Sequence, residues 1–136
     1  MHVAGRLAAL VNDISRSRGG RPVRWLGDGG MFHFREPHTA VLAGLDMIER
    51  APAAGLPPAH VGIHTGPVIS QDGDVYGRNV NLAARIASYA QAGQVVVSEE
   101  TARRSDHHDL QFAPRGVVDL KGVAEPLPLY QPFHRP

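Results

Sequence analysis

Two short apolar segments joined by a glycine-rich turn constrain the fold of this chain most strongly. Residues 22–26 and 31–34 are mainly apolar, and the sequence Gly-Asp-Gly-Gly at 27–30 separates them. This pattern is typical of a β-hairpin with an Asp-Gly turn at its tip. Segments with helical spacing of apolar residues lie on both sides of the hairpin. Because antiparallel strands and helices are mixed along one chain, the sequence indicates an α+β fold.

The remaining segments extend this pattern. Helical periodicity predicts three longer helices, over residues 2–18, 37–50 and 79–92. Apolar runs predict further strands, over residues 60–70, 94–98, 116–120 and 127–130. Ser98 is a suitable N-cap for a short helix after the second of these strands. The order is close to a ferredoxin-like pattern, with helices on one face of an antiparallel or mixed sheet, except that the first strand is absent. We expect a single domain over residues 1–136, N-terminally incomplete relative to that pattern.

Composition excludes several classes of protein. The chain has no cysteine, which excludes a disulfide scaffold, a Cys-ligated zinc site, an iron–sulfur cluster and a thiol nucleophile. A net charge of +1 without a basic stripe argues against nucleic-acid binding driven by phosphate charge. No apolar run approaches the roughly 20 residues of a membrane helix, and the amphipathic start does not resemble a signal peptide. The expected location is therefore cytoplasmic.

Polar residues in three places are candidates for chemistry. Asp28 lies at the hairpin tip, where a carboxylate between glycines is accessible to a hard cation such as Mg²⁺, although Asp-Gly is also common in plain turns. Asn81 and Arg85 lie four residues apart on a predicted helix and share one face. Together they can hold a sugar hydroxyl and a phosphate, although an exposed polar stripe has the same spacing. Lys121 is the only lysine among 14 basic residues and precedes a turn glycine, which favours a phosphate contact.

The order of four motifs resembles the catalytic domain of the class III nucleotidyl cyclases, the adenylate and guanylate cyclases. The resemblance is strongest to bacterial members of the actinobacterial type and extends over about residues 2–132. The motifs that carry it are RWLGD at 24–28, HTGPV at 64–68, YGRNVNLAAR at 76–85 and LKGVAEP at 120–126.

The resemblance implies an adenylate cyclase that converts ATP to 3′,5′-cyclic AMP and pyrophosphate. It implies two divalent metal ions, Mg²⁺ or Mn²⁺, in sites shared between the two chains of a homodimer. Asp28 matches a metal-binding aspartate, and Lys121 matches a lysine that binds the terminal phosphates. Asn81 matches the residue that orients the ribose. Arg85 matches the arginine that stabilises the transferring phosphoryl group.

Base recognition rests on two further matches. Asp74 corresponds to the residue that accepts a hydrogen bond from the adenine amino group, and it favours adenine over guanine. Arg24 stands where adenylate cyclases usually carry a lysine. Its guanidinium can donate to the adenine ring, or it can pair bidentately with Asp74 and occupy the base pocket. Trp25 and Tyr76 can line that pocket, although aromatic residues in strands more often pack against neighbours.

A second departure concerns the first metal-binding aspartate of the family, which lies on a strand before the first helix. This chain begins with that helix and is expected to be a fragment that is inactive as it stands. The strand is central in the family's sheet, so its loss would leave buried backbone groups unpaired. We therefore expect a rearranged sheet, a swapped segment or an atypical dimer.

Two other functions remain open. A degenerate cyclase that binds nucleotide or dimerises without turnover would carry most of the same motifs. A metal site built on histidines is the other, with His107 and His108 as its only tight cluster. Adjacent histidines on a strand point in opposite directions, and their spacing matches no standard zinc motif. His33 is interpreted as a strand residue on the polar face, and His64 as a structural residue.

Overall fold

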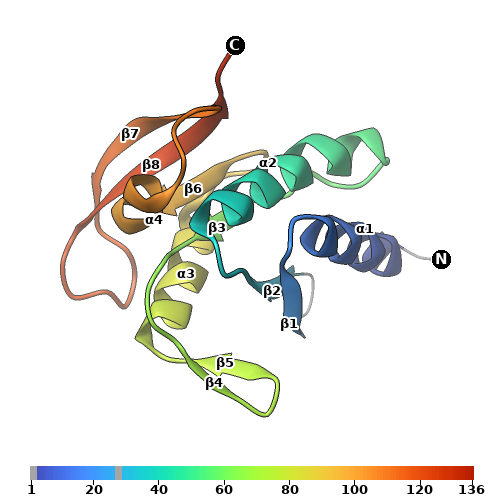
Figure 1. Cartoon of the computed structure of the whole chain (residues 1–136), viewed down its shortest axis with the longest axis horizontal. Helices are drawn as coiled ribbons and strands as arrows, with labels where there is room; N and C mark the ends of the chain where they lie inside the picture. Colours follow the sequence, from blue (N-terminus) through green and yellow to red (C-terminus); the bar gives the residue numbers. More distant parts are fainter. Residues whose placement is uncertain (1–2, 27–28) are drawn as a thin grey trace.

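The computed structural model describes residues 3–26 and 29–136 and confirms the α+β fold (Figure 1). The first half contains α1 (Val3–Ser17), the hairpin of β1 (Arg21–Leu26) and β2 (Gly29–His33), and α2 (Pro37–Ala53). Next come β3 (Val61–Ile63), a second hairpin of β4 (Ile69–Gln71) and β5 (Asp74–Tyr76), and α3 (Arg78–Tyr89). The last elements are β6 (Val95–Ser98), α4 (Glu99–Arg104), β7 (Leu110–Val118) and β8 (Leu127–His134). Among the described helices, none is long and apolar enough to cross a membrane.

The main sheet has four strands in the order β3-β6-β8-β7. β3 is parallel to β6, whereas β8 is antiparallel to both of its neighbours. Val95 and Val97 of β6 pack with α2, and Val96 packs on the opposite side with α3. The expectation that helices cover only one face is therefore wrong. The three consecutive valines make β6 apolar on both faces, so each face requires a covering helix.

Two strand boundaries also differ from the sequence prediction. The strand expected over residues 60–70 is divided into β3 and β4, which belong to different sheets. Gly66 and Pro67 interrupt it: Pro67 lacks an N–H, and a Cβ at Gly66 would lie 2.5 Å from Asn79 Nδ2. β7 begins at Leu110, earlier than expected, and it tolerates Pro114 because it is the edge strand.

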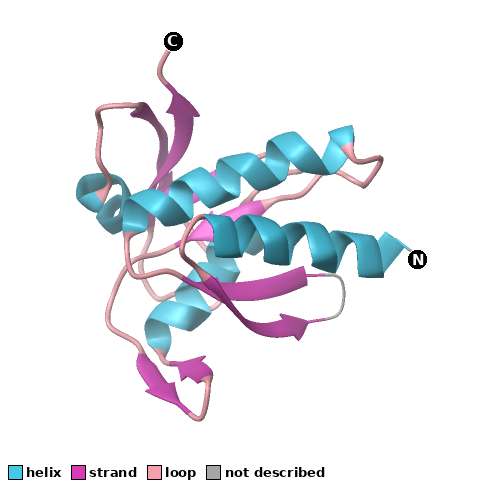
Figure 2. Ribbon diagram, turned by 45° about the vertical axis from the view of Figure 1, so that its right-hand side comes forward, coloured by secondary structure: helices cyan, strands magenta, loops and turns pink. Residues whose placement is uncertain are grey.

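The hairpin of β1 and β2 is separate from the four-stranded main sheet. β1 and β2 pair only with each other, and within the described ranges no strand pairs with the second edge of β2 or of β3. α1 packs on this hairpin and on α2, through Val11, Ile14 and Phe32 among others (Figure 2). The rearranged sheet, the swapped segment and the atypical dimer expected from the sequence therefore each stay a prediction.

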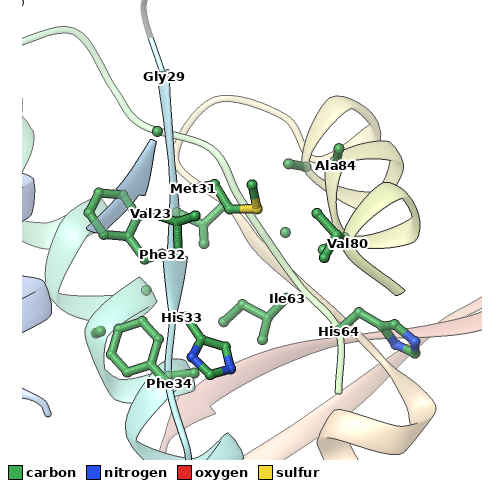
Figure 3. A pocket seen from close by; sticks show the side chains of 18 of the residues that line it. Val23, Gly29, Met31, Phe32, His33, Phe34, Ile63, His64, Val80 and Ala84 are labelled. Atoms are coloured by element: carbon green, nitrogen blue, oxygen red, sulfur yellow. The ribbon is translucent and has the colours of Figure 1, made fainter. Parts of the chain in front are cut away.

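A groove of about 1740 Å³ occupies the space between β2 and β3. Figure 3 shows Met31 of β2, Ile63 of β3, and Val80 and Ala84 of α3 around it. His33 lines the same groove and is half-buried, whereas its neighbours Phe32 and Phe34 pack in the cluster with α1. Its interpretation as a residue of the polar face stays a prediction. Burial and the nearby positive charges of Arg21 and Arg35 lower the pKa of His33.

Candidate active site

Arg24 and Asp74 meet where β1 passes the β4–β5 hairpin. Asp74 follows a tight turn in which Asp72 (φ 54°) and Gly73 (φ 81°) both adopt left-handed conformations. Such a turn ends abruptly and places Asp74 at the first position of β5. Arg24 Nη1 lies 3.5 Å from Asp74 Oδ2, and Arg24 Nη2 donates to the Val75 carbonyl at 3.2 Å.

The pairing of Arg24 with Asp74, one of the two outcomes expected from the sequence, is therefore present but not bidentate. One guanidinium nitrogen contacts the carboxylate, and another contacts a backbone carbonyl. Arg24 Nε is buried without a hydrogen-bond partner in the described chain. The guanidinium carbon also lies 5.9 Å from the centre of the Tyr76 ring, within range of a cation–π contact.

Several neighbours keep the Asp74 carboxylate ionised. The backbone N–H of Val75 donates to Asp74 Oδ1 at 2.8 Å and lowers the pKa of this carboxyl group. The Tyr76 hydroxyl and the charges of Arg24 and Arg21 lower the pKa further. The same contact with Asp74 raises the pKa of Tyr76. At neutral pH the hairpin thus presents a charged hydrogen-bond acceptor beside an exposed aromatic ring.

Asn81 and Arg85 lie on the exposed face of α3, as the four-residue spacing predicts. The opposite face is fixed by Ile86, which is fully buried against Val96. Arg85 reaches the turn between β7 and β8, where a Cβ at Gly122 would lie 3.3 Å from Arg85 Nη2. The guanidinium therefore lies against the backbone next to Lys121.

The structure thus brings Arg85 to the segment that carries Lys121. Within the described residues, neither cation forms an ion pair. Two exposed and unpaired cations on neighbouring segments form a surface on which an anion such as a phosphate can bind. No hydrogen bond or ion pair joins this surface to Arg24 or Asp74 in the described part of the chain.

The predicted metal ligand Asp28 lies outside the described residues. Over residues 3–26 and 29–136, no three His, Cys, Asp or Glu side chains gather into a metal site. His107 Nε2 bonds to the Ala102 carbonyl at 2.6 Å, and the His108 N–H donates to Asp106, so both bonds serve the local loop.

A polar cluster around His64 was only partly recognised from the sequence. His64 Nδ1 lies 2.7 Å from Ser98 Oγ, and His64 Nε2 lies 2.9 Å from Asn79 Oδ1. Ser98 accepts from the Thr101 N–H at 3.4 Å, as expected for the N-cap of α4. Burial lowers the pKa of His64. His64 is structural in position, as interpreted, but Asn79 had no distinguishing signal beyond its place in the YGRNVNLAAR motif.

Residues 37–131, which include Asp74, Asn81, Arg85 and Lys121, match the family described as the adenylate and guanylate cyclase catalytic domain. The chain belongs to this family. An uncharacterized protein of Mycobacterium tuberculosis is 32% identical to the cyclase domain over 130 residues, which are 94% of this chain and 34% of that protein. An adenylate cyclase of Streptomyces coelicolor is 37% identical over an alignment of 99 positions, which covers 69% of this chain and 26% of that protein.

Solved structures confirm the cyclase fold. The catalytic core of a rhodopsin-guanylyl cyclase with converted specificity, in complex with ATPαS, superposes with a TM-score of 0.84. It is 23% identical, and the alignment covers 98% of this chain and 82% of that core. The cyclase domain spans about a third or less of the length of the curated relatives described above.

Proposed function

We propose that this cyclase domain is the catalytic domain of an adenylate cyclase, which converts ATP to 3′,5′-cyclic AMP and pyrophosphate. The observation that carries the proposal is the ionised Asp74 carboxylate at the β4–β5 hairpin. Adenine presents an amino donor where guanine presents a carbonyl acceptor. A carboxylate therefore accepts a hydrogen bond from adenine and repels guanine. The similarity to a Streptomyces coelicolor adenylate cyclase supports the same assignment.

The cations of α3 and of the β7–β8 turn would act on the phosphates. In the reaction the ribose 3′-hydroxyl attacks the α-phosphorus, the bond to the bridging oxygen breaks, and pyrophosphate leaves. Arg85 would stabilise the charge that develops on the transferring phosphoryl group, and Lys121 would bind the terminal phosphates. Asn81 would orient the ribose through its amide. These roles require residues that are exposed and free of ion pairs, as Arg85 and Lys121 are within the described chain.

Family members typically use two divalent metal ions, Mg²⁺ or Mn²⁺, which neutralise phosphate charge when bound. Asp28 is our proposed ligand for one of them. In the homodimer that we propose, each site is shared between the chains. One chain would supply the metal ligand, and the other would supply the contacts to the base, the ribose and the transferring phosphoryl group.

A degenerate regulatory module is the second candidate, and the Arg24 contact favours it. The guanidinium already contacts the carboxylate that adenine requires, so base binding must displace it. Such a module would bind ATP at this surface without releasing cyclic AMP.

The natural full-length polypeptide, assayed with ATP and Mn²⁺, tests the choice. Arg85→Ala is expected to lower cyclic AMP production by about 10²–10³-fold, the cost of removing one donor from a developing negative charge. Arg103→Ala is the matched control, because Arg103 is an exposed arginine of α4 whose ion pair within residues 3–26 and 29–136 is with Glu99. ATP binding with no cyclic AMP in the wild type would favour the regulatory module.

A further inference from the structure

His64 joins three segments of the fold through its imidazole ring. It follows β3, is half-buried, and points away from Ile63 in Figure 3. One ring nitrogen bonds to Ser98, the cap of α4, and the other to Asn79 in the first turn of α3. The roles proposed for Asn81 and Arg85 do not involve the His64 ring, so its two hydrogen bonds need a separate explanation.

The hydrogen-bond partners determine which ring nitrogen carries the proton. Asn79 Nδ2 donates to the Pro67 carbonyl at 2.7 Å, and a carbonyl can only accept. The amide orientation is therefore fixed, with Asn79 Oδ1 toward His64. Nε2 must carry the hydrogen of that 2.9 Å bond, and Nδ1 accepts from the Ser98 hydroxyl at 2.7 Å. Burial lowers the pKa of His64, so at neutral pH the ring is a neutral imidazole in the Nε2–H tautomer.

The start of α3 depends on this contact because its N-cap has no side chain. The cap residue is Gly77, with φ 127°, and it supplies no side-chain hydrogen bond. Asn79 instead connects the first turn to Pro67 and His64. Its amide also fills the space above Gly66, where a Cβ would lie 2.5 Å from Asn79 Nδ2. Asn81 and Arg85 follow on the same helix, so this anchor sets their position.

We propose that neutral His64 is a positioning residue, which holds α3 through Asn79 so that Asn81 and Arg85 keep the geometry needed for phosphoryl transfer. The inference rests on the proposed function for what those two residues do. Protonation at Nδ1 would reverse only the bond to Ser98, whose hydroxyl could then donate to Thr101 Oγ1, 3.1 Å away. It would leave the bond from Nε2 to Asn79 in place, so this bond is the contact that holds α3.

Groups on and around the helices that pack against His64 both favour and oppose protonation of its ring. Glu100 of α4 favours the protonated ring, whereas burial opposes protonation more strongly. α4 also carries Arg104 and α3 carries Arg78, and both side chains are positive and exposed. Because Nε2 donates to Asn79 in either protonation state, the contact with α3 persists on the acid side. Removal of the ring is expected to lower kcat, while the KM for ATP changes little.

Two variants of the full-length protein test the proposal. His64→Leu removes both bonds and is expected to lower kcat by about 10- to 100-fold, because small misplacements of catalytic groups have effects of this size. His64→Gln retains a donor for Asn79 and should therefore keep most of kcat. His134→Leu and His134→Gln are the matched controls, since His134 is exposed near the end of β8.

A kcat of His64→Gln as low as that of His64→Leu would overturn the proposal. A change in KM alone in His64→Leu would also overturn it. A readout without activity separates this proposal from the proposed function. Imidazole ¹⁵N shifts should report the Nε2–H tautomer, and His64→Leu should speed amide exchange at the start of α3 but not in β8. The Nδ1–H tautomer, or equal exchange in both segments, would refute the positioning role even if the protein made no cyclic AMP.

Discussion

Gly62 controls how closely α3 approaches β3. A Cβ at Gly62 would lie 2.1 Å from the Ala87 backbone nitrogen, 2.5 Å from Ala87 Cα and 2.7 Å from the Ile86 carbonyl carbon. All three atoms belong to the helix backbone, so no side-chain rotation relieves the clash. Ordinary contact begins near 3.4 Å, so α3 must move away by about 3.4 − 2.1 = 1.3 Å.

Gly62→Ala is therefore expected to lower the free energy of unfolding by about 1–3 kcal/mol, the usual cost of overpacking a tight interior. The same shift displaces Arg85 and is expected to lower cyclic AMP production by about 10²-fold. Urea unfolding followed by circular dichroism measures the first effect, and an ATP turnover assay of the full-length protein measures the second.

Gly44→Ala is the matched control on α2. Its added Cβ would meet only side-chain atoms, at 3.3 Å from Ile63 Cδ1 and Val61 Cγ1. Replacing a helical glycine also favours the helix by about 1 kcal/mol, so this variant should stay within about 1 kcal/mol of the wild type. If Gly62→Ala were as stable and as active as Gly44→Ala, the argument for a fixed helix–strand distance would be refuted.

The base-binding contacts and the open strand edges give three further expectations. Arg24→Lys should lower the KM for ATP, because one ammonium cannot make both contacts of the guanidinium; an unchanged or higher KM in steady-state kinetics would contradict this. Because the pKa of Asp74 is lowered, the contribution of its carboxylate to ATP binding is fully present above the ordinary pKa range of aspartate. This contribution is lost only as the pH falls through the lowered pKa. The affinity for ATP, measured by calorimetry, should therefore show no loss of this carboxylate between pH 6 and 8, and a loss assigned to Asp74 within that range would argue against it. Amides of β2 and β3 that face the groove should exchange faster than those of β6, and equal protection by NMR would show that these edges are paired in solution.

The sequence predicted most elements because their patterns are local. The helical periodicity of residues 37–50 and 79–92 and the Gly-Asp-Gly-Gly turn each need only neighbouring residues. The division of residues 60–70 was missed because the apolar residues before and after Gly66 and Pro67 were assigned to one strand. The two-sided cover of β6 could have been inferred from its consecutive valines, since a strand with one solvated face alternates instead.

The sequence predicted which residues are candidates for the site, but not which contacts they make. The resemblance supplied Asp74, Asn81, Arg85 and Lys121, whereas the exact contacts of Arg24 depend on residues 50 or more positions away in the chain. The bonds of His64 join residues 15 and 34 positions apart. Such contacts leave no periodic signal, so only the folded structure reveals that one ring holds the starts of two helices.

The most direct test of an adenylate cyclase is a competition between nucleotides. The full-length polypeptide is incubated with equal concentrations of ATP and GTP and with Mn²⁺, and both cyclic products are quantified by mass spectrometry. Cyclic AMP in clear excess over cyclic GMP is the predicted result, with the excess reduced in Asp74→Asn, whose amide can also donate to guanine. Cyclic GMP in excess, or neither product from a folded protein that binds ATP, would contradict the account.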